Sequence, residues 1–218
     1  MANPKKHKKV KQHTRYELKE GTYIPGITTI TGMMNKPQLV NWSNKLGLEG
    51  INVTQYVDEL ASIGSIAHDY AEAKFKGEKF DDSEYTEKQM ECALVCIDKF
   101  NEIFKQRDFK TILCEKPLIS ETYKYGGTLD WYGIMDGKKV LLDWKTGSGF
   151  YEEHKMQLSA NKQLLEENGH VVEKCLLIGI GRNSWESTHI EDVGGMDLRF
   201  KKFLNLLEIY NINKKLKV

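Results

Sequence analysis

Two aspartates and a lysine lie close together in the sequence, around a predicted hairpin turn. Asp130 precedes the dipeptide Asp136-Gly137, and Asp143 and Lys145 follow it. Asp-Gly favours a two-residue hairpin turn, and a turn centred there places Asp130 directly opposite Asp143 on paired strands. Side chains alternate between the faces of a strand, so Lys145 shares the face of Asp143. The sequence therefore predicts two carboxylates and an ammonium group at one place on a sheet.

These side chains suit a divalent metal ion and a phosphate group. Facing carboxylates repel each other and destabilise a strand pair, unless a cation lies between them. Mg²⁺ prefers oxygen ligands and is held by one or two carboxylates together with substrate phosphate. The ammonium group of Lys145 would stabilise charge that develops on the phosphate, or orient an attacking water. The alternative is an exposed sheet face with an ordinary Asp–Lys ion pair, and the hairpin alone does not decide between the two.

Alternation divides the side chains of the hairpin into two predicted faces. The strands are expected over residues 129–135 and 138–144. An apolar face, expected to pack in the core, carries Leu129, Trp131, Met135, Val140, Leu142 and Trp144. The opposite face carries Asp130, Tyr132, Lys139, Asp143 and Lys145. A shift of one residue in the register would exchange the two faces.

The hairpin resembles the signature of the PD-(D/E)XK nuclease superfamily. In that family an acidic residue on one strand is followed, across a hairpin, by D/E-x-K, which corresponds here to Asp130 and Asp143-Trp144-Lys145. The longer pattern is similar to the RecB-type and phage exonuclease branch: Gly127-Thr-Leu-Asp130, then Leu-Leu-Asp-Trp-Lys-Thr-Gly, then a helix bearing Gln157. D-x-K alone is common by chance, whereas the ordered set is specific. The resemblance implies catalytic roles for Asp130, Asp143, Lys145 and Gln157, with Mg²⁺ or Mn²⁺ as cofactor and DNA as substrate.

A histidine upstream extends the resemblance. The long helix predicted over residues 53–75 contains Gly64-Ser-Ile-Ala-His68-Asp-Tyr-Ala-Glu72, which matches the RecB-type motif Gly-x-x-x-His-x-x-x-Glu. The resemblance implies that His68 joins Asp130 and Asp143 as a metal ligand, with Glu72 in support. It implies the same ligand role for Glu115. Taken alone, His68 is more often a hydrogen-bonded structural histidine, and Glu115 is as well explained as an exposed strand carboxylate.

Further residues are predicted around the hairpin. Gln157 fits the family's Gln-x-x-x-Tyr motif, but Asn161 stands at the tyrosine position, so a stacking or hydrogen-bonding ring is missing. Three side chains are predicted to contact DNA: Arg182, Tyr132 and Lys139. For Arg182 an ordinary loop arginine is an equal alternative.

The four cysteines have no spacing typical of a disulfide framework. They are Cys92, Cys96, Cys114 and Cys175. We expect buried free thiols in a reducing compartment. Some RecB-type nucleases carry an Fe–S cluster on one upstream cysteine and a C-terminal trio; this trio is absent, so we expect no Fe–S cluster.

Charge is distributed unevenly along the 218 residues. The net charge is +1, but residues 1–15 contain five lysines and one arginine without an acid, so residues 16–218 sum to −5. Residues 1–20 are predicted to form a basic, flexible tail, either solvated or in contact with phosphate. The body, residues 21–218, must bind DNA through a local basic patch. No apolar run approaches membrane-spanning length, which favours a cytoplasmic protein of a bacterial or phage-infected cell that contacts no membrane.

The predicted fold is a mixed α/β domain, in which helices flank the sheet. Residues 21–108 are expected to be mainly helical and residues 109–218 to form the catalytic sheet, as in the restriction-endonuclease-like core of the PD-(D/E)XK family. Strands are predicted within residues 22–30 and over 110–119, 129–135, 138–144, 175–180 and 185–190. Helices are predicted over 39–48, 53–75, 86–106, 151–168 and 196–210. The helix 39–48 is expected to turn Leu39, Trp42, Leu46 and Val40 inward.

The predicted function is a metal-dependent deoxyribonuclease. The branch resemblance favours an exonuclease of phage or prokaryotic DNA recombination or processing, acting on single-stranded or duplex ends, with or without a helicase or recombination partner. One alternative is a structure-specific or nicking endonuclease. Another is a catalytically silent nuclease fold that binds nucleic acid or a protein partner.

Overall fold

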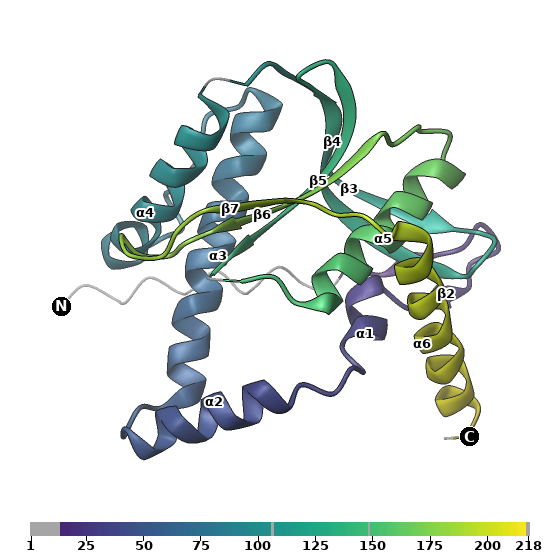
Figure 1. The fold of residues 1–218 in the computed structure, drawn as a ribbon, viewed down its shortest axis with the longest axis horizontal. Helices are drawn as coiled ribbons and strands as arrows, with labels where there is room; N and C mark the ends of the chain where they lie inside the picture. Colours follow the sequence, from purple (N-terminus) through teal and green to yellow (C-terminus); the bar gives the residue numbers. More distant parts are fainter. Residues whose placement is uncertain (1–13, 106, 148, 217–218) are drawn as a thin grey trace.

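The computed structural model describes residues 14–105, 107–147 and 149–216 (Figure 1). The strands are β1 (Tyr16–Glu17), β2 (Tyr23–Ile24), β3 (Phe109–Ser120), β4 (Tyr125–Met135), β5 (Lys138–Thr146), β6 (Lys174–Ile180) and β7 (His189–Asp192). The helices are α1 (Ile27–Thr31), α2 (Pro37–Leu48), α3 (Val53–Lys76), α4 (Glu87–Phe104), α5 (Glu152–Glu167) and α6 (Met196–Leu216). None of the helices within these ranges combines the length and apolar content that a membrane span requires.

A five-stranded mixed sheet forms the centre of the fold, as predicted. Its strand order is β3-β4-β5-β6-β7. All neighbours are antiparallel except β5 and β6, which run parallel. A parallel pair needs a crossover connection, and α5 supplies it. The last strand, predicted over 185–190, instead spans His189–Asp192 as β7.

The predicted hairpin between β4 and β5 is confirmed. Asp136 and Gly137 have φ values of 50° and 79°, which suit a tight hairpin turn. Residue pairing runs from Met135 with Lys138 to Trp131 with Leu142, the register that the turn predicts. The local turn chemistry therefore fixes the alignment of the two strands.

Helices cover both faces of the sheet (Figure 1). On one face, Trp131, Leu142 and Trp144 pack with Phe75 of α3 and Phe100 of α4. On the other face, the sheet packs against α5, which in turn contacts α6; the buried residues on this side include Leu129, Tyr132, Leu141, Leu158, Leu165 and Leu177. The mixed sheet with flanking helices is thus present, with the mainly helical part preceding residue 109.

Side-chain alternation breaks at Asp130, and the predicted face of Leu129 is wrong, whereas Trp131, Met135, Val140, Leu142 and Trp144 share one face as predicted. Leu129 and Tyr132 both pack in the core on the α5 side, although residues three apart in a regular strand lie on opposite faces. Trp131 packs with α3 and α4 instead. On the neighbouring strand, Glu115 adopts a φ of +48°, in the left-handed region that non-glycine residues rarely enter. This local irregularity in both strands turns side chains out of the regular pattern.

The N-terminal part differs from the prediction in two ways. Residues 14–20, predicted to belong to the flexible tail, include β1 and the buried Leu18, so the ordered part starts earlier than expected. The strand expected within residues 22–30 is replaced by the short β2 and the helix α1, whose Ile27 and Ile30 are buried. Five lysines of the predicted tail, Lys5, Lys6, Lys8, Lys9 and Lys11, lie outside the described residues.

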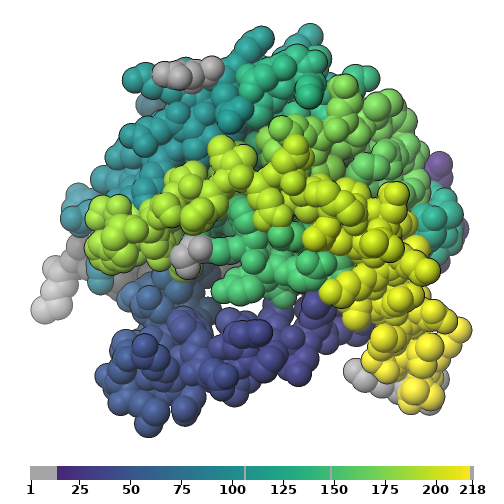
Figure 2. All heavy atoms as spheres, viewed as in Figure 1, coloured from purple at the N-terminus to yellow at the C-terminus, as the bar shows by residue number. Residues whose placement is uncertain are grey.

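The helix α2 is present but starts at Pro37, two residues before the predicted start, and the predicted inward packing of its apolar residues is wrong. No residue of α2 is buried, and Leu39, Val40 and Trp42 are 47%, 67% and 36% exposed. Together with the first half of α3 it extends away from the sheet, where few other elements cover it (Figures 1 and 2). The apolar stripe of this helix therefore does not contribute to the core.

Candidate metal site

His68, Glu115 and Asp130 come together although they lie far apart in the sequence. Each offers one ligand atom, and these atoms all lie within 4.8 Å of one another. His68 belongs to α3, Glu115 to β3 and Asp130 to β4. The Nδ1 atom of His68 is 3.7 Å from Oε1 of Glu115. This group could hold a metal ion, and it contains three of the four predicted ligands.

The Asp130 carboxylate lies where β4 and β5 stop pairing regularly. Regular residue pairing between the two strands extends from the turn as far as Trp131 with Leu142. Beyond it, Asp130 Oδ2 accepts the backbone N–H of Trp144 at 3.0 Å, so the side chain takes the place of a backbone partner. Asp130 is 8% exposed. The hydrogen bond fixes one oxygen of this buried carboxylate.

Backbone conformation and close helix packing position the other two ligands. The left-handed conformation of Glu115 costs on the order of 1–3 kcal/mol, and such strain concentrates at functional sites. His68 packs beside Trp144, with 5.2 Å between the ring centroids. One turn earlier, a Cβ on Gly64 would lie 3.1 Å from Oγ1 of Thr146, so the glycine lets α3 approach the end of β5. This explains a glycine in the middle of a long helix.

Asp143, the fourth predicted ligand, faces a different partner. It is 1% exposed, and its Oδ2 lies 2.7 Å from Nζ of Lys145. Apart from this ion pair, neither of its oxygens has a hydrogen-bond partner among the described side chains and backbone groups. Asp143 and Lys145 therefore form an ion pair on one strand, as expected. Asp143 is not one of the three clustered ligands.

The charges of the site influence one another strongly. Burial raises the pKa of Asp130 to about 7, and the nearby charge of Asp143 adds to the increase. Burial acts to lower the pKa of His68, but the charge of Asp130 and the neighbouring carboxylate of Glu115 outweigh it, and the net shift is upward. Burial likewise opposes the charged form of Lys145, but Asp143 and Asp130 raise its pKa overall. The two aspartates thus repel each other, as the facing carboxylates of the sequence predict.

This environment fits a divalent cation. A cation would relieve the repulsion between the two buried carboxylates and would replace the proton that Asp130 holds near neutral pH. Carboxylate oxygens suit Mg²⁺ and Mn²⁺, while an imidazole nitrogen is a common ligand of transition metals. The donor set of His68, Glu115 and Asp130 is therefore compatible with the expected metals.

The other predicted residues lie on α3, on α5 and directly after β6. Gln157 lies half-buried on α5, the helix that packs against β4 and β5. Glu72 pairs with Lys76, with 2.6 Å between Oε1 and Nζ. Arg182 lies beside the end of β5, since a Cβ on Gly147 would come within 2.6 Å of its Nη2 atom. This places the guanidinium of Arg182 next to the loop that follows Lys145, where a phosphate contact is sterically reasonable.

Two of the residues predicted to contact DNA are placed unfavourably. Tyr132 is 1% exposed, and its hydroxyl donates to the backbone oxygen of Val171 at 2.7 Å. Tyr132 lies on the predicted strand face, but α5 covers that face in the structure, so its side chain is not accessible to DNA. Lys139 is exposed near the hairpin turn, four residues before Asp143 and thus about 13 Å away along the strand.

His154 is a site neighbour that the sequence analysis missed. It lies in the first turn of α5, where its Nδ1 accepts the backbone N–H of Tyr151 at 3.3 Å. Burial lowers the pKa of His154, and the charge of Lys145 lowers it further, which places the imidazole near the Asp143–Lys145 pair. The sequence feature that could have indicated His154 is its position three residues before Gln157, which puts both side chains on the same face of the helix.

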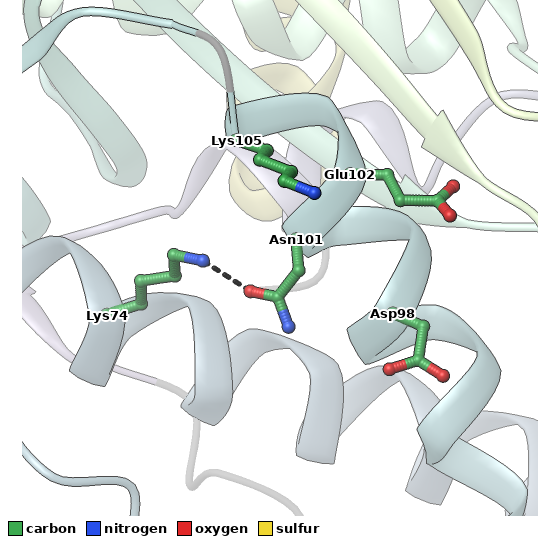
Figure 3. A pocket seen from close by; sticks show the side chains of 5 residues that line it. All are labelled: Lys74, Asp98, Asn101, Glu102 and Lys105. Carbon is green, nitrogen blue, oxygen red and sulfur yellow. Dashed lines mark hydrogen bonds between the residues drawn. The ribbon is translucent and has the colours of Figure 1, made fainter.

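A surface pocket of about 460 Å³ lies elsewhere, between α3 and α4 (Figure 3). It is lined by Lys74, Asp98, Asn101, Glu102 and Lys105. Lys74 donates to the side-chain oxygen of Asn101, which also accepts the hydroxyl of Tyr70 at 2.9 Å. Its two lysines and two acids balance in charge, and it holds none of the clustered ligands. The His68 cluster, and not this pocket, is therefore the candidate site.

Comparisons with known proteins leave the family open. No family model matches the chain, and no curated protein does. Among solved structures, a candidate exonuclease from Eubacterium rectale is 14% identical, with a TM-score of 0.48 over 71% of this chain and 66% of that chain. The structure of SSO0001 is 16% identical, with a TM-score of 0.33 over 67% of this chain and 70% of that chain. The chain thus spans just under two thirds of the first of these structures, and both likenesses are too low to establish a function.

Proposed function

We propose that the protein is a divalent-metal-dependent deoxyribonuclease of the PD-(D/E)XK type. The observation that carries the proposal is the meeting of His68, Glu115 and Asp130 beside the Asp143–Lys145 pair. The motif resemblance links these five residues, and their approach from α3 and three strands supports a site for a metal ion and a phosphate group. A purely structural ion-pair network would not need two buried, mutually repelling aspartates.

His68, Glu115 and Asp130 would hold Mg²⁺ or Mn²⁺, with Asp143 next to them. The bound ion would supply a water of lowered pKa and would neutralise charge on the scissile phosphate. Lys145, kept protonated by Asp143 and Asp130, stabilises negative charge on the phosphate or orients the attacking water. Water adds to phosphorus and the P–O3′ bond breaks, which leaves a 5′-phosphate and a 3′-hydroxyl. Gln157 supports the site from α5.

Within this class we favour an exonuclease of phage or prokaryotic DNA recombination or processing. The longer motif set, from the Gly64–Glu72 helix to Gln157, resembles the RecB-type and phage exonuclease branch. A structure-specific or nicking endonuclease is the alternative with the same chemistry. A catalytically silent fold is the alternative from another class, and retention of both aspartates and of Lys145 argues against it.

A cleavage assay tests the proposal directly. End-labelled single-stranded DNA, linear duplex and closed circular duplex are incubated with Mg²⁺, Mn²⁺ or EDTA. We expect loss of linear substrates only, abolished by EDTA and by Asp143→Asn or Lys145→Met, substitutions that nearly preserve side-chain size. Lys138→Ala, which removes an exposed lysine of the same strand, serves as the control that retains activity.

Each other outcome has a definite meaning. Nicking of the circular duplex would favour the endonuclease. Full activity of a correctly folded Asp143→Asn or Lys145→Met variant would refute the assignment of the site. Metal binding without cleavage of any substrate would favour the silent fold.

A further inference from the structure

Exposed apolar side chains gather on α2 and the first turns of α3, and the proposed site does not use them. We call residues 37–57 the arm, which extends away from the sheet (Figure 1). Seven large hydrophobic side chains of the arm are exposed: Leu39, Val40, Trp42, Leu48, Ile51, Tyr56 and Val57. Soluble proteins rarely expose so many neighbouring apolar side chains unless a ligand or a partner covers them. The arm is therefore a candidate binding surface.

Two aromatic rings of the arm lie side by side. The ring centroids of Trp42 on α2 and Tyr56 on α3 are 6.1 Å apart, with 42° between the ring planes. Each of the two residues is 36% exposed. Unpaired bases stack on tryptophan and tyrosine rings, because every base has an apolar π-face. The pair thus offers a stacking surface to a single-stranded nucleic acid.

The polar side chains of the arm suit base edges better than phosphates. Its exposed amides are Gln38, Asn41, Asn44, Asn52 and Gln55. Amide side chains both donate hydrogen bonds to base edges and accept them. The charged residues of the arm are Lys45 and Glu49, which cancel each other, with 4.0 Å between Nζ and Oε1. A neutral surface with two aromatic rings and five amides fits bases, and not the phosphate backbone.

Both ends of the arm border the candidate site. At one end, Nζ of Lys36 lies 2.8 Å from the carboxylate of Glu153, which precedes His154 in the first turn of α5. At the other end, α3 continues from Val57 to His68, eleven residues or about three turns later, so both side chains lie on one face of the helix. The rise between them is about 16 Å. This is the length of about five stacked nucleotides at 3.4 Å each.

We propose that the arm binds unpaired bases of single-stranded DNA about five nucleotides from the scissile bond, with Trp42 and Tyr56 as the stacking residues. The inference rests on the proposed nuclease function and adds the class of its substrate. Bases inside a duplex stack on one another, so the arm favours a single strand or an unpaired end. Trp42 and Tyr56 bind the strand and take no part in the chemical step.

Anisotropy of a fluorescent oligothymidine strand and of a fluorescent duplex, measured in EDTA, tests the inference without cleavage. Stacking of one base on an aromatic ring contributes about 5- to 100-fold in affinity. We expect Trp42→Ala and Tyr56→Ala each to weaken strand binding by a factor in this range and to leave duplex binding nearly unchanged. Trp42→Phe keeps a stacking ring and should keep most of the affinity. Trp185→Ala removes an 82% exposed indole between β6 and β7 and is the matched control that keeps all of it.

Two further measurements separate base stacking from a merely structural role of Trp42. In a Trp185→Phe background, Trp42 is the exposed tryptophan, because Trp131 and Trp144 are 0% and 1% exposed. Oligothymidine should therefore quench the fluorescence of Trp42 when it binds. Stacking on a neutral surface releases no counterions, so the loss in Trp42→Ala should be the same factor at 50 and at 200 mM KCl.

Failure of this inference differs from failure of the proposed function. Unchanged strand affinity of Trp42→Ala and Tyr56→Ala, or equal losses for strand and duplex, would overturn the inference while cleavage still supports the nuclease. Dimers of the intact chain that Trp42→Ala converts to monomers without weaker strand binding would overturn it in favour of an interface between copies of the chain. Strand binding that depends on the arm, in a chain that cuts no substrate, would retain the arm and reject the nuclease.

Discussion

Replacement of Asp130 by asparagine should stabilise the metal-free protein at alkaline pH while it abolishes metal binding. Burial and the charge of Asp143 raise the pKa of Asp130 from 3.8 to about 7. The folded state therefore binds this proton more tightly than the unfolded state does, and stability falls as pH rises from about 4 through about 7. Asparagine removes the charge, and its oxygen can still accept the N–H of Trp144.

The size of the effect follows from the pKa difference. Each pKa unit corresponds to about 1.4 kcal/mol, so ionising Asp130 in the folded protein costs up to roughly 4 kcal/mol above pH 7. At pH 5 only part of this cost is present, because Asp130 is still protonated in the folded state. We therefore expect the free energy of unfolding of Asp130→Asn to exceed that of the wild type by roughly 2–3 kcal/mol more at pH 8.5 than at pH 5.

Urea unfolding in EDTA at the two pH values measures this difference, with Asp58→Asn, an exposed residue of α3, as the control. Addition of Mn²⁺ should then stabilise the wild type at pH 8.5, because an ion that binds only the folded state adds RT ln(1 + [L]/Kd). It should not stabilise Asp130→Asn. A variant no more stable than the wild type at pH 8.5 in EDTA would refute the reasoning that two buried carboxylates repel each other here.

Further predictions concern the metal and the packing. Mn²⁺ affinity, measured by calorimetry, should rise with pH through about 7 as Asp130 loses its proton; affinity independent of pH would contradict this. Gly127→Ala should cost about 1–3 kcal/mol in urea unfolding, because its Cβ would overlap Ile27, whereas Gly149→Ala, with open space around it, should cost little. Trp42→Ala should cost less than about 1 kcal/mol and Trp131→Ala about 3–5 kcal/mol, and equal losses would show that α2 packs against the body.

The sequence by itself determined the features that depend on local chemistry. The Asp136-Gly137 dipeptide fixed the hairpin and its register, because both residues tolerate the positive φ that a tight turn requires. The long helix predicted over residues 53–75 is present as α3 (Val53–Lys76), and in the structure Thr86 and Gln89 form a capping box at the start of α4. The pairing of Asp143 with Lys145 followed from strand alternation. The fold class, a mixed sheet flanked by helices, followed from the order of these elements.

The tertiary structure decided which side chains meet. No local signal indicates that Glu115 adopts a left-handed conformation or that alternation breaks at Asp130, yet these two features direct both carboxylates toward His68. The packing of α5 buries Tyr132, and the extension of α2 from the sheet leaves Trp42 partly exposed despite its apolar stripe. Periodicity tells which face of an element is apolar, but the other elements decide what covers that face. The contacts of the site depend on strand irregularity and on packing between distant segments, and both are decided by the whole chain.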